Sequence, residues 1–152
     1  MGRTDICMTP DEIGAVLTDA TNLQVATLGV DGFPHLTTLW FFVDHGIVTF
    51  RSFTKSQRIV NLMREPKLTV LAELGDDYSE LRGVMIQGTA ELSTDPEQVM
   101  RVYYEVARKM EGPDVSTEAI EAGFGRFATK NTVVRVIPHR IISWDHRKLS
   151  GY

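Results

Sequence analysis

Hydrophobic and polar residues alternate along much of this chain, and the period of the alternation changes from segment to segment. Near the start, a hydroxyl at Thr9, a proline at position 10 and acidic residues at 11 and 12 precede apolar residues at helical spacing. A hydroxyl cap, an early proline and acids near the positive end are typical of a helix N-terminus. We predict a helix that begins there and lies across a sheet on a narrow apolar face.

From Leu23 to Phe53 the period shortens to two. Three runs rich in β-branched and aromatic residues, LQVATLG, HLTTLWFFV and IVTFRS, are separated by Asp31-Gly32 and by Asp44-His45-Gly46. This pattern predicts three antiparallel strands in a meander with short turns. The second run places apolar residues on both of its faces. Such a sheet is either the wall of a small closed barrel or is packed against another subunit.

The stretch from Ile47 to Pro66 combines a strand, a polar turn and an amphipathic pattern. Residues 54–57, Thr-Lys-Ser-Gln, match a capping box, and Pro66 marks the exit, so we predict a helix between them. A helix N-terminus favours anions because its N–H groups are free and its dipole is positive there. Cations and hydroxyls surround this one: Arg51, Ser52, Thr54, Lys55, Ser56 and Arg58. The stretch therefore predicts a phosphate site, and the alternative is a capped surface helix whose cations are solvated.

The remaining segments predict strands and helices in a fixed order. They are strands over Leu68 to Leu74 and Val84 to Leu92, a long helix from the capping signal at 94–97 to Gly112-Pro113, a short helix capped by Ser116, and strands over Val133 to Ile137 and Ile141 to Trp144. Gly88 inside a strand indicates a bulge or a close backbone approach. Because the early connections are too short for parallel crossovers, we predict a mainly β protein of the α+β class, an antiparallel barrel with peripheral helices.

Composition excludes several classes of protein. A hydrophobic content of 43% and a charged content of 24% are ordinary for one soluble domain, here residues 1–152. The net charge of −4 argues against nonspecific nucleic-acid binding. A single cysteine, no apolar run of membrane-spanning length and no apolar signal-peptide core lead us to expect a cytoplasmic protein with no membrane partner. The four histidines lack metal-ligand spacing, and the motifs of serine hydrolases, dinucleotide-binding folds and P-loops do not occur.

Three segments resemble the split β-barrel flavin and deazaflavin oxidoreductases related to pyridoxamine 5′-phosphate oxidase. They are VATLGVDGFPHLTTLWFFVD, TFRSFTKSQRIVNLMREPKLTVL and VMIQGTAELSTDPE. The resemblance runs from about Asp11 to Leu149 and implies an antiparallel split β-barrel of the FMN-binding type. It departs from the vitamin B6 enzyme at the tail, SWDHRKLSGY, which is similar to the actinobacterial branch that uses coenzyme F-420.

The resemblance also implies where a cofactor binds. Arg51 and Ser52 match the strand-end phosphate contacts, and Ser56, Gln57 and Arg58 match a Ser-Arg-Lys turn. Gln57 thus stands where the oxidase has a cation, and that cation is lost unless Lys55 replaces it. Thr37, Thr38 and Leu39 match the strand whose backbone faces the ring, and Gln87 matches a polar position near it.

The family is dimeric, which implies a homodimer with the cofactor at the interface. The leading hypothesis is a reductase that uses reduced coenzyme F-420, a deazaflavin, to reduce a small unsaturated acceptor. The first alternative keeps the fold and exchanges the cofactor for FMN, in an oxidase or flavin reductase. The second alternative is a nonenzymatic protein that binds a cofactor or a tetrapyrrole. The resemblance implies no particular catalytic side chain.

Overall fold

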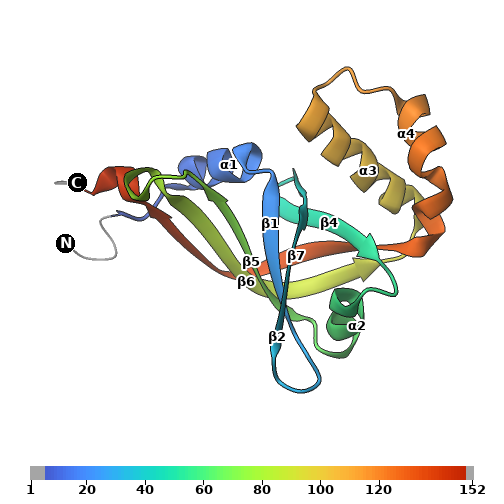
Figure 1. Ribbon diagram of the computed structural model, residues 1–152, viewed down its shortest axis with the longest axis horizontal. Coiled ribbons are helices and arrows are strands. Elements are labelled where there is room, and N and C mark those ends of the chain that lie inside the picture. The colour runs from blue at the N-terminus through green and yellow to red at the C-terminus, as the bar shows by residue number, and fades with distance from the viewer. Residues whose placement is uncertain (1–5, 150–152) are drawn as a thin grey trace.

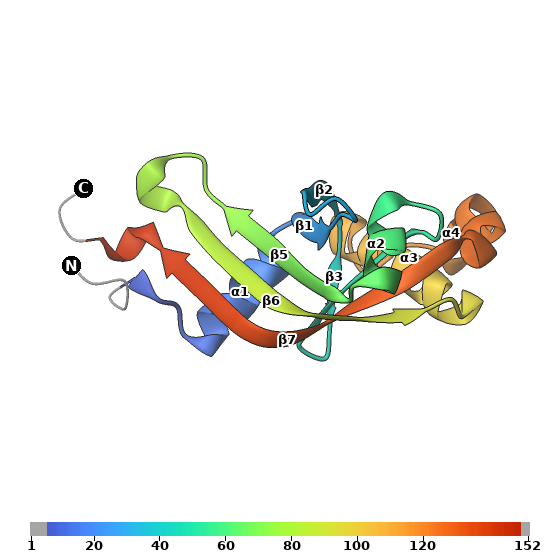
Figure 2. The same cartoon turned by 90° about the horizontal axis from the view of Figure 1, so that it is seen from below.

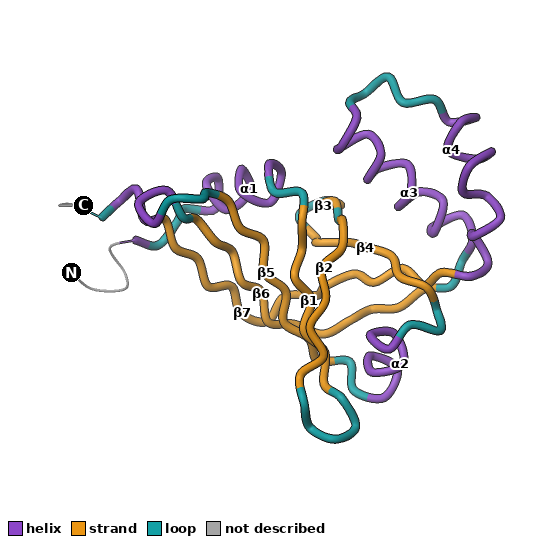
Figure 3. The backbone as a smooth tube through the Cα atoms, viewed as in Figure 1, coloured by secondary structure: helices purple, strands orange, loops and turns teal. Residues whose placement is uncertain are grey.

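In the computed structural model, which describes residues 6–149, seven strands form one antiparallel sheet with four α-helices around it (Figures 1 and 3). The strands are β1 (Asn22–Leu28), β2 (Pro34–Trp40), β3 (Phe42–Asp44), β4 (Ile47–Phe53), β5 (Lys67–Leu74), β6 (Arg82–Ser93) and β7 (Asn131–Asp145). The helices are α1 (Pro10–Asp19), α2 (Gln57–Arg64), α3 (Pro96–Glu111) and α4 (Thr117–Phe124), with short 3₁₀ segments at Tyr78–Glu80, Gly125–Lys130 and His146–Lys148. The predicted mainly β, α+β class is confirmed. Residues 1–5 and 150–152, which the predicted domain and tail include, lie outside the described residues.

The strand order shows how the sheet curls. The order is β2-β1-β5-β6-β7-β4-β3, so β2 and β3 lie at opposite edges although only Phe41 separates them in sequence. A chain can join the two edges of one sheet through a single residue only if the sheet bends round on itself. Phe41 is fully buried at that junction. The result is a split β-barrel, as predicted, whose seam runs between β2 and the β3–β4 edge.

The predicted three-strand meander is wrong in its pairing. The second run breaks at Phe41 into two strands; β2 pairs with β1, and β3 pairs with β4. The break buries both Phe41 and Phe42, each in a different hydrophobic cluster. Local alternation of apolar residues could not reveal the break, because both halves of the run are β-patterned.

A bulge bends the two longest strands. β6 pairs with β7 along its whole length, and both strands are visibly curved in Figure 2. The register shifts at Gln87/Gly88, where Gly88 is opposite Pro138. The bulge predicted at Gly88 is therefore confirmed, whereas the two predicted final strands are one strand. Pro138 is tolerated because β4 pairs with β7 only as far as Arg135, so the missing N–H of Pro138 costs no ladder bond on that side.

The helix caps were predicted with mixed success. Thr9 and Glu12 form the predicted capping box of α1, which packs on β5 and β6. The capping box predicted from Thr54 is wrong. The α2 helix begins at Gln57 after Ser56, and the Thr54 hydroxyl lies 2.9 Å from the hydroxyl of Thr132. Asp95 caps α3, one residue after the predicted start, and Ser116 caps α4 as predicted.

Two hydrophobic clusters hold the elements together. The larger one fills the inside of the curled sheet beneath α1 and α2, with Val25, Phe50 and Ile59 fully buried. The smaller one joins α3 and α4 to Phe42 of β3 and to Val133 of β7. Within residues 6–149, no helix is both long and apolar enough to cross a bilayer.

Candidate cofactor site

Four of the residues predicted to bind a cofactor form one hydrogen-bonded group, the Arg58 cluster (Thr37, Ser52, Ser56 and Arg58). Arg58 donates from Nε to Thr37 Oγ1 at 2.9 Å and from Nη1 to Ser52 Oγ at 2.6 Å. The Ser52 and Ser56 hydroxyls lie 2.9 Å apart. Arg58 thus spans the seam of the split barrel, from β2 to β4.

The Arg58 cluster lacks a negative charge. Arg58 is half-buried, and burial lowers the pKa of its guanidinium. Every ion pair among residues 6–149 joins other side chains, so no described carboxylate pairs with Arg58. The side chain of Ser56 does not cap α2, so it does not satisfy the first N–H groups of that helix. A half-buried cation at an uncapped helix N-terminus is an arrangement that favours an anion.

Arg51 lies on the other face of β4 from Ser52, as alternation along a strand requires. Its guanidinium carbon lies 3.5 Å from the centroid of the Tyr103 ring, and its Nη1 donates to Asn131 Oδ1 at 3.3 Å. The side chain lines a small pocket with Leu39, which was also predicted to bind the cofactor. Arg51 and Leu39 are therefore neighbours of the Arg58 cluster without belonging to its hydrogen-bond network.

Gln57 and Lys55 flank the Arg58 cluster in different ways. The exposed Gln57 donates to Asn61 Oδ1 at 2.8 Å, and the fully buried Asn61 donates to Thr27 Oγ1 at 3.0 Å. Gln57 therefore belongs to a chain of hydrogen bonds that fixes α2 on β1. Lys55 is exposed in the turn before α2, where its flexible stem can reach an anion held by Arg58.

Gln87 and Thr38 lie on the opposite, outer face of the sheet. Across the sheet, Gln87 of β6 is opposite Thr69 of β5, which is opposite Ala26 of β1, which is opposite Leu36 of β2. Residues opposite one another share a face, so Gln87 shares its face with Leu36 and not with Thr37. Three strand spacings of about 4.8 Å separate β6 from β2, roughly 14 Å along the sheet. Gln87 lines an outer pocket with Lys67 and His139. One chain alone therefore does not bring Gln87 to the Arg58 cluster.

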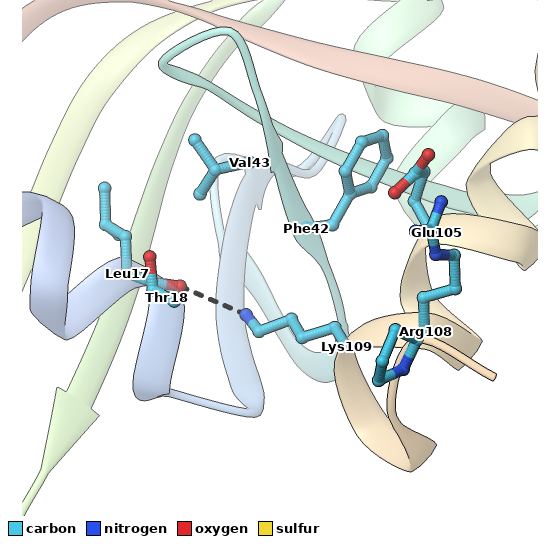
Figure 4. Close-up of a pocket in the computed structure, with 8 residues that line it drawn as sticks. Leu17, Thr18, Phe42, Val43, Glu105, Arg108 and Lys109 are labelled. Carbon is cyan, nitrogen blue, oxygen red and sulfur yellow. Dashed lines mark hydrogen bonds between the residues drawn. The ribbon is translucent and has the colours of Figure 1, made fainter. Parts of the chain in front are cut away.

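Another pocket, of about 410 Å³, lies elsewhere, between α1, β3 and α3 (Figure 4). Lys109 reaches across it from α3, donates to the carbonyl oxygen of Leu17 at 3.1 Å, and lies 3.6 Å from the centroid of the Phe41 ring. None of the predicted cofactor residues lines this pocket. Its chemistry is that of a half-buried lysine holding α3 against α1.

We expect Lys109 to make stability depend on pH. Burial lowers the pKa of Lys109 to about 8, while Asp19 raises it slightly, and the ordinary value is 10.5. Between these values the unfolded chain keeps a proton that the folded chain has lost, so the free energy of unfolding should rise with pH across this window. The gain is about 1–3 kcal/mol after allowing for solvent screening. Urea unfolding at several pH values measures it.

Lys109→Met is the variant that isolates this effect. The variant should lack the rise, while groups that titrate elsewhere contribute equally to both proteins. Equal pH slopes for the wild type and Lys109→Met between about pH 8 and 10.5 would contradict the assignment.

The described side chains do not form a metal centre. Within residues 6–149, no group of three or more His, Cys, Asp or Glu side chains is placed to hold a metal ion.

Comparison with known proteins identifies the family. The profile described as pyridoxamine 5′-phosphate oxidase matches residues 9–144. The chain belongs to this family. The Arg58 cluster therefore lies across the seam of a protein of this family. No protein with a curated description matches the chain.

Solved structures agree with the family assignment. The conserved hypothetical protein Rv2991 from Mycobacterium tuberculosis is 37% identical over 97% of this chain and 91% of its own, with a TM-score of 0.86. An F420 reductase is 21% identical over 84% of this chain and 93% of its own, with a TM-score of 0.64. The heme storage protein HutZ from Vibrio cholerae is 16% identical over 88% and 94%, with a TM-score of 0.67. The last two show a shared fold.

Several residues around the site were not predicted from the sequence. Asn61 was missed, although the sequence held a signal for it. It is a polar residue that lies between Ile59 and Leu62 on the buried side of α2. Asn131 and Tyr103, which hold Arg51, come from distant segments, and nothing in the local sequence connects them to β4.

Proposed function

We propose that this protein binds the deazaflavin coenzyme F-420 and uses its reduced form to reduce a small unsaturated molecule. The observation that carries the proposal is the Arg58 cluster. A half-buried guanidinium held by two hydroxyls, with no carboxylate partner among the described residues, is complementary to a phosphate. Family membership and the fold shared with an F420 reductase support the choice of cofactor.

The charge of the cluster favours a phosphodiester. Only Arg58 is built into the hydrogen-bond network, because Gln57 stands where a second cation would be and Lys55 is exposed. One held cation matches the single charge of the phosphodiester in F-420. The terminal phosphate of FMN carries between one and two charges near neutral pH, as phosphate monoesters do, and would gain more from a second held cation.

The remaining residues would orient the ring. β2 is an edge strand, so its outer N–H and C=O groups, from Thr37 to Leu39, are free of sheet pairing and can bond the polar edge of a planar ring. Thr38 would contribute through this backbone, since its side chain points to the outer face. The reduced cofactor would supply the hydride and solvent the accompanying proton, while the chain would supply phosphate binding and orientation.

A second copy of the chain would complete the site. Gln87 lies on the outer face, about three strands from β2, and approaches a cofactor held at Arg58 only if it comes from a partner. That outer face exposes Leu28 and Leu36, which are 42% and 66% accessible. Exposed apolar residues on a sheet face are typical of an interface. We therefore propose a homodimer with two equivalent sites.

Cofactor titration tests the proposed function directly. Adding the purified protein to F-420 should quench or shift the fluorescence of the cofactor with a Kd in the micromolar range or below, and FMN should bind more weakly. Turnover of simple enones with the reduced cofactor then establishes the reaction. Binding of FMN alone, or of hemin alone, would replace F-420 by the flavin or the tetrapyrrole alternative. Tight F-420 binding without turnover of any acceptor would favour a carrier.

A further inference from the structure

Arg51 is a second half-buried arginine without an acidic partner. It is stacked on Tyr103, with 3.5 Å between the guanidinium carbon and the ring centroid, and one nitrogen donates to Asn131. Within residues 6–149, no carboxylate forms an ion pair with it. A guanidinium has five N–H donors, so a single bond to Asn131 leaves most of them free. Burial lowers the pKa of Arg51, but the group stays charged because arginine titrates far above neutral pH.

Arg51 lines a small pocket. Its walls are Leu39, Trp40, Arg51 and Val106, and its volume is about 120 Å³. We call it the Arg51 pocket. Three of the four walls are apolar, and Arg51 is the only charged one. A carboxylate attached to a flat apolar group matches this lining in size, charge and polarity, because a planar guanidinium binds a carboxylate through two parallel hydrogen bonds.

The Arg51 pocket adjoins the proposed cofactor site without being part of it. Arg51 and Ser52 are consecutive on β4 and point to opposite faces, so the side chain of Arg51 does not reach the phosphate position beside Ser52. The two sites are linked through β2. Thr37 contacts Arg58, and Leu39, two residues on, lines the Arg51 pocket, a step of roughly 7 Å along the strand.

We propose that Arg51 binds the carboxylate of an aromatic or conjugated acid, and that the acceptor reduced by this protein is an unsaturated carboxylic acid. The stacking on Tyr103 and the bond to Asn131 fix the plane of the guanidinium, and Leu39 and Trp40 accommodate the flat body of the acid. The identity of this acid as the acceptor rests on the proposed function. The carboxylate site itself does not.

Benzoate and its neutral isostere benzamide test the site in the cofactor-free protein. Trp40 forms a wall of the pocket, so its fluorescence should change as the pocket fills. At matched ionic strength, sodium benzoate should bind at least about tenfold more tightly than benzamide, the preference expected for a hydrogen-bonded charged pair. Arg51→Gln should remove the preference, and Arg51→Lys should reduce it because lysine keeps the charge but lacks the fork.

Two control variants show whether the preference and the optical signal both come from the Arg51 pocket. Arg126 also stacks on an aromatic ring, 4.7 Å from the centroid of Phe127, and does not line the pocket, so Arg126→Gln should keep the preference. Trp40→Phe should lose the optical signal, while calorimetry with benzoate still shows binding. Thermal unfolding of each variant confirms that it is folded.

Equal binding of benzoate and benzamide to the wild type would overturn the proposal. So would a full preference in folded Arg51→Gln, which would show that Arg51 does not bind the carboxylate. Loss of F-420 affinity in Arg51→Gln, with the benzoate preference intact, would assign Arg51 to the cofactor. The proposed function has its own test, because absence of F-420 binding to the wild type would contradict it. If the same protein still prefers benzoate, the carboxylate site is supported without the proposed function.

Discussion

Replacing Arg58 by alanine should weaken binding of the phosphate-bearing cofactor by about 1.5–3 kcal/mol, or roughly 10- to 150-fold in Kd. The reason is that Arg58 is the only cation fixed in the cluster, by its bonds to Thr37 and Ser52. In the variant a phosphate would keep only the hydroxyls and the N–H groups of the α2 terminus. Fluorescence titration of F-420 measures the effect. The deazaflavin without its phosphate should lose much less affinity, because the change removes a phosphate contact.

Arg64→Ala is the matched control for this experiment. Arg64 is at the other end of the same helix, where it donates to the carbonyl oxygen of Leu28. Its removal should leave cofactor affinity within about twofold, because the site is six residues away, at the opposite terminus of α2. Unchanged F-420 affinity in a folded Arg58→Ala protein would remove Arg58 from the site. An equal loss of affinity for the phosphate-free ring would show that the residue acts on the fold of the seam instead.

The fold could be predicted where local chemistry decides it. The cap at Thr9 and the bulge at Gly88 depend on residues close together in the sequence, and the structure confirms both. The wrong predictions concern residues whose contacts come from distant parts of the sequence. Thr54 has the composition of a capping residue, but its hydroxyl lies beside Thr132, and this distant contact replaces the cap. The break at Phe41 likewise follows from closure of the whole sheet.

The candidate site was predicted as a set of residues but not as a geometry. Ser52, Ser56 and Arg58 are close in sequence, and the structure brings them together with Thr37 from another strand. Neighbouring residues of a strand point to opposite faces, so Arg51 and Ser52 could not both point toward one phosphate. The resemblance to the family motif placed both of them at the phosphate. The position of Gln87 depends on the order of β2, β1, β5 and β6, which no local pattern contains. Its role therefore stays a prediction that involves a partner chain.

Replacing Gly88 by alanine should destabilise the fold by about 1–3 kcal/mol or more, the cost of forcing extra atoms into a packed interior. A Cβ at this position would lie 2.2 Å from the carbonyl oxygen of Ile137 and 3.0 Å from its carbon. Both are backbone atoms of the paired strand, so the clash is relieved only by moving β7 at the bulge. For a chain of this length, the expected fall in Tm is roughly 2–12 °C. Calorimetry or circular dichroism measures it.

Gly14→Ala makes the same chemical change where there is room for it. A Cβ at Gly14 meets nothing within 4 Å, and the residue lies inside α1, where alanine is the better helix former. This control should raise stability by up to about 1 kcal/mol. The bulge at Gly88 bends β6 and β7, and β7 pairs with β4, which contains Ser52. Movement at the bulge should therefore also displace Ser52 from Arg58. We therefore expect Gly88→Ala, and not Gly14→Ala, to weaken F-420 binding even at temperatures where both proteins are folded. A Gly88→Ala protein as stable as the wild type would show that β7 yields at the bulge without cost.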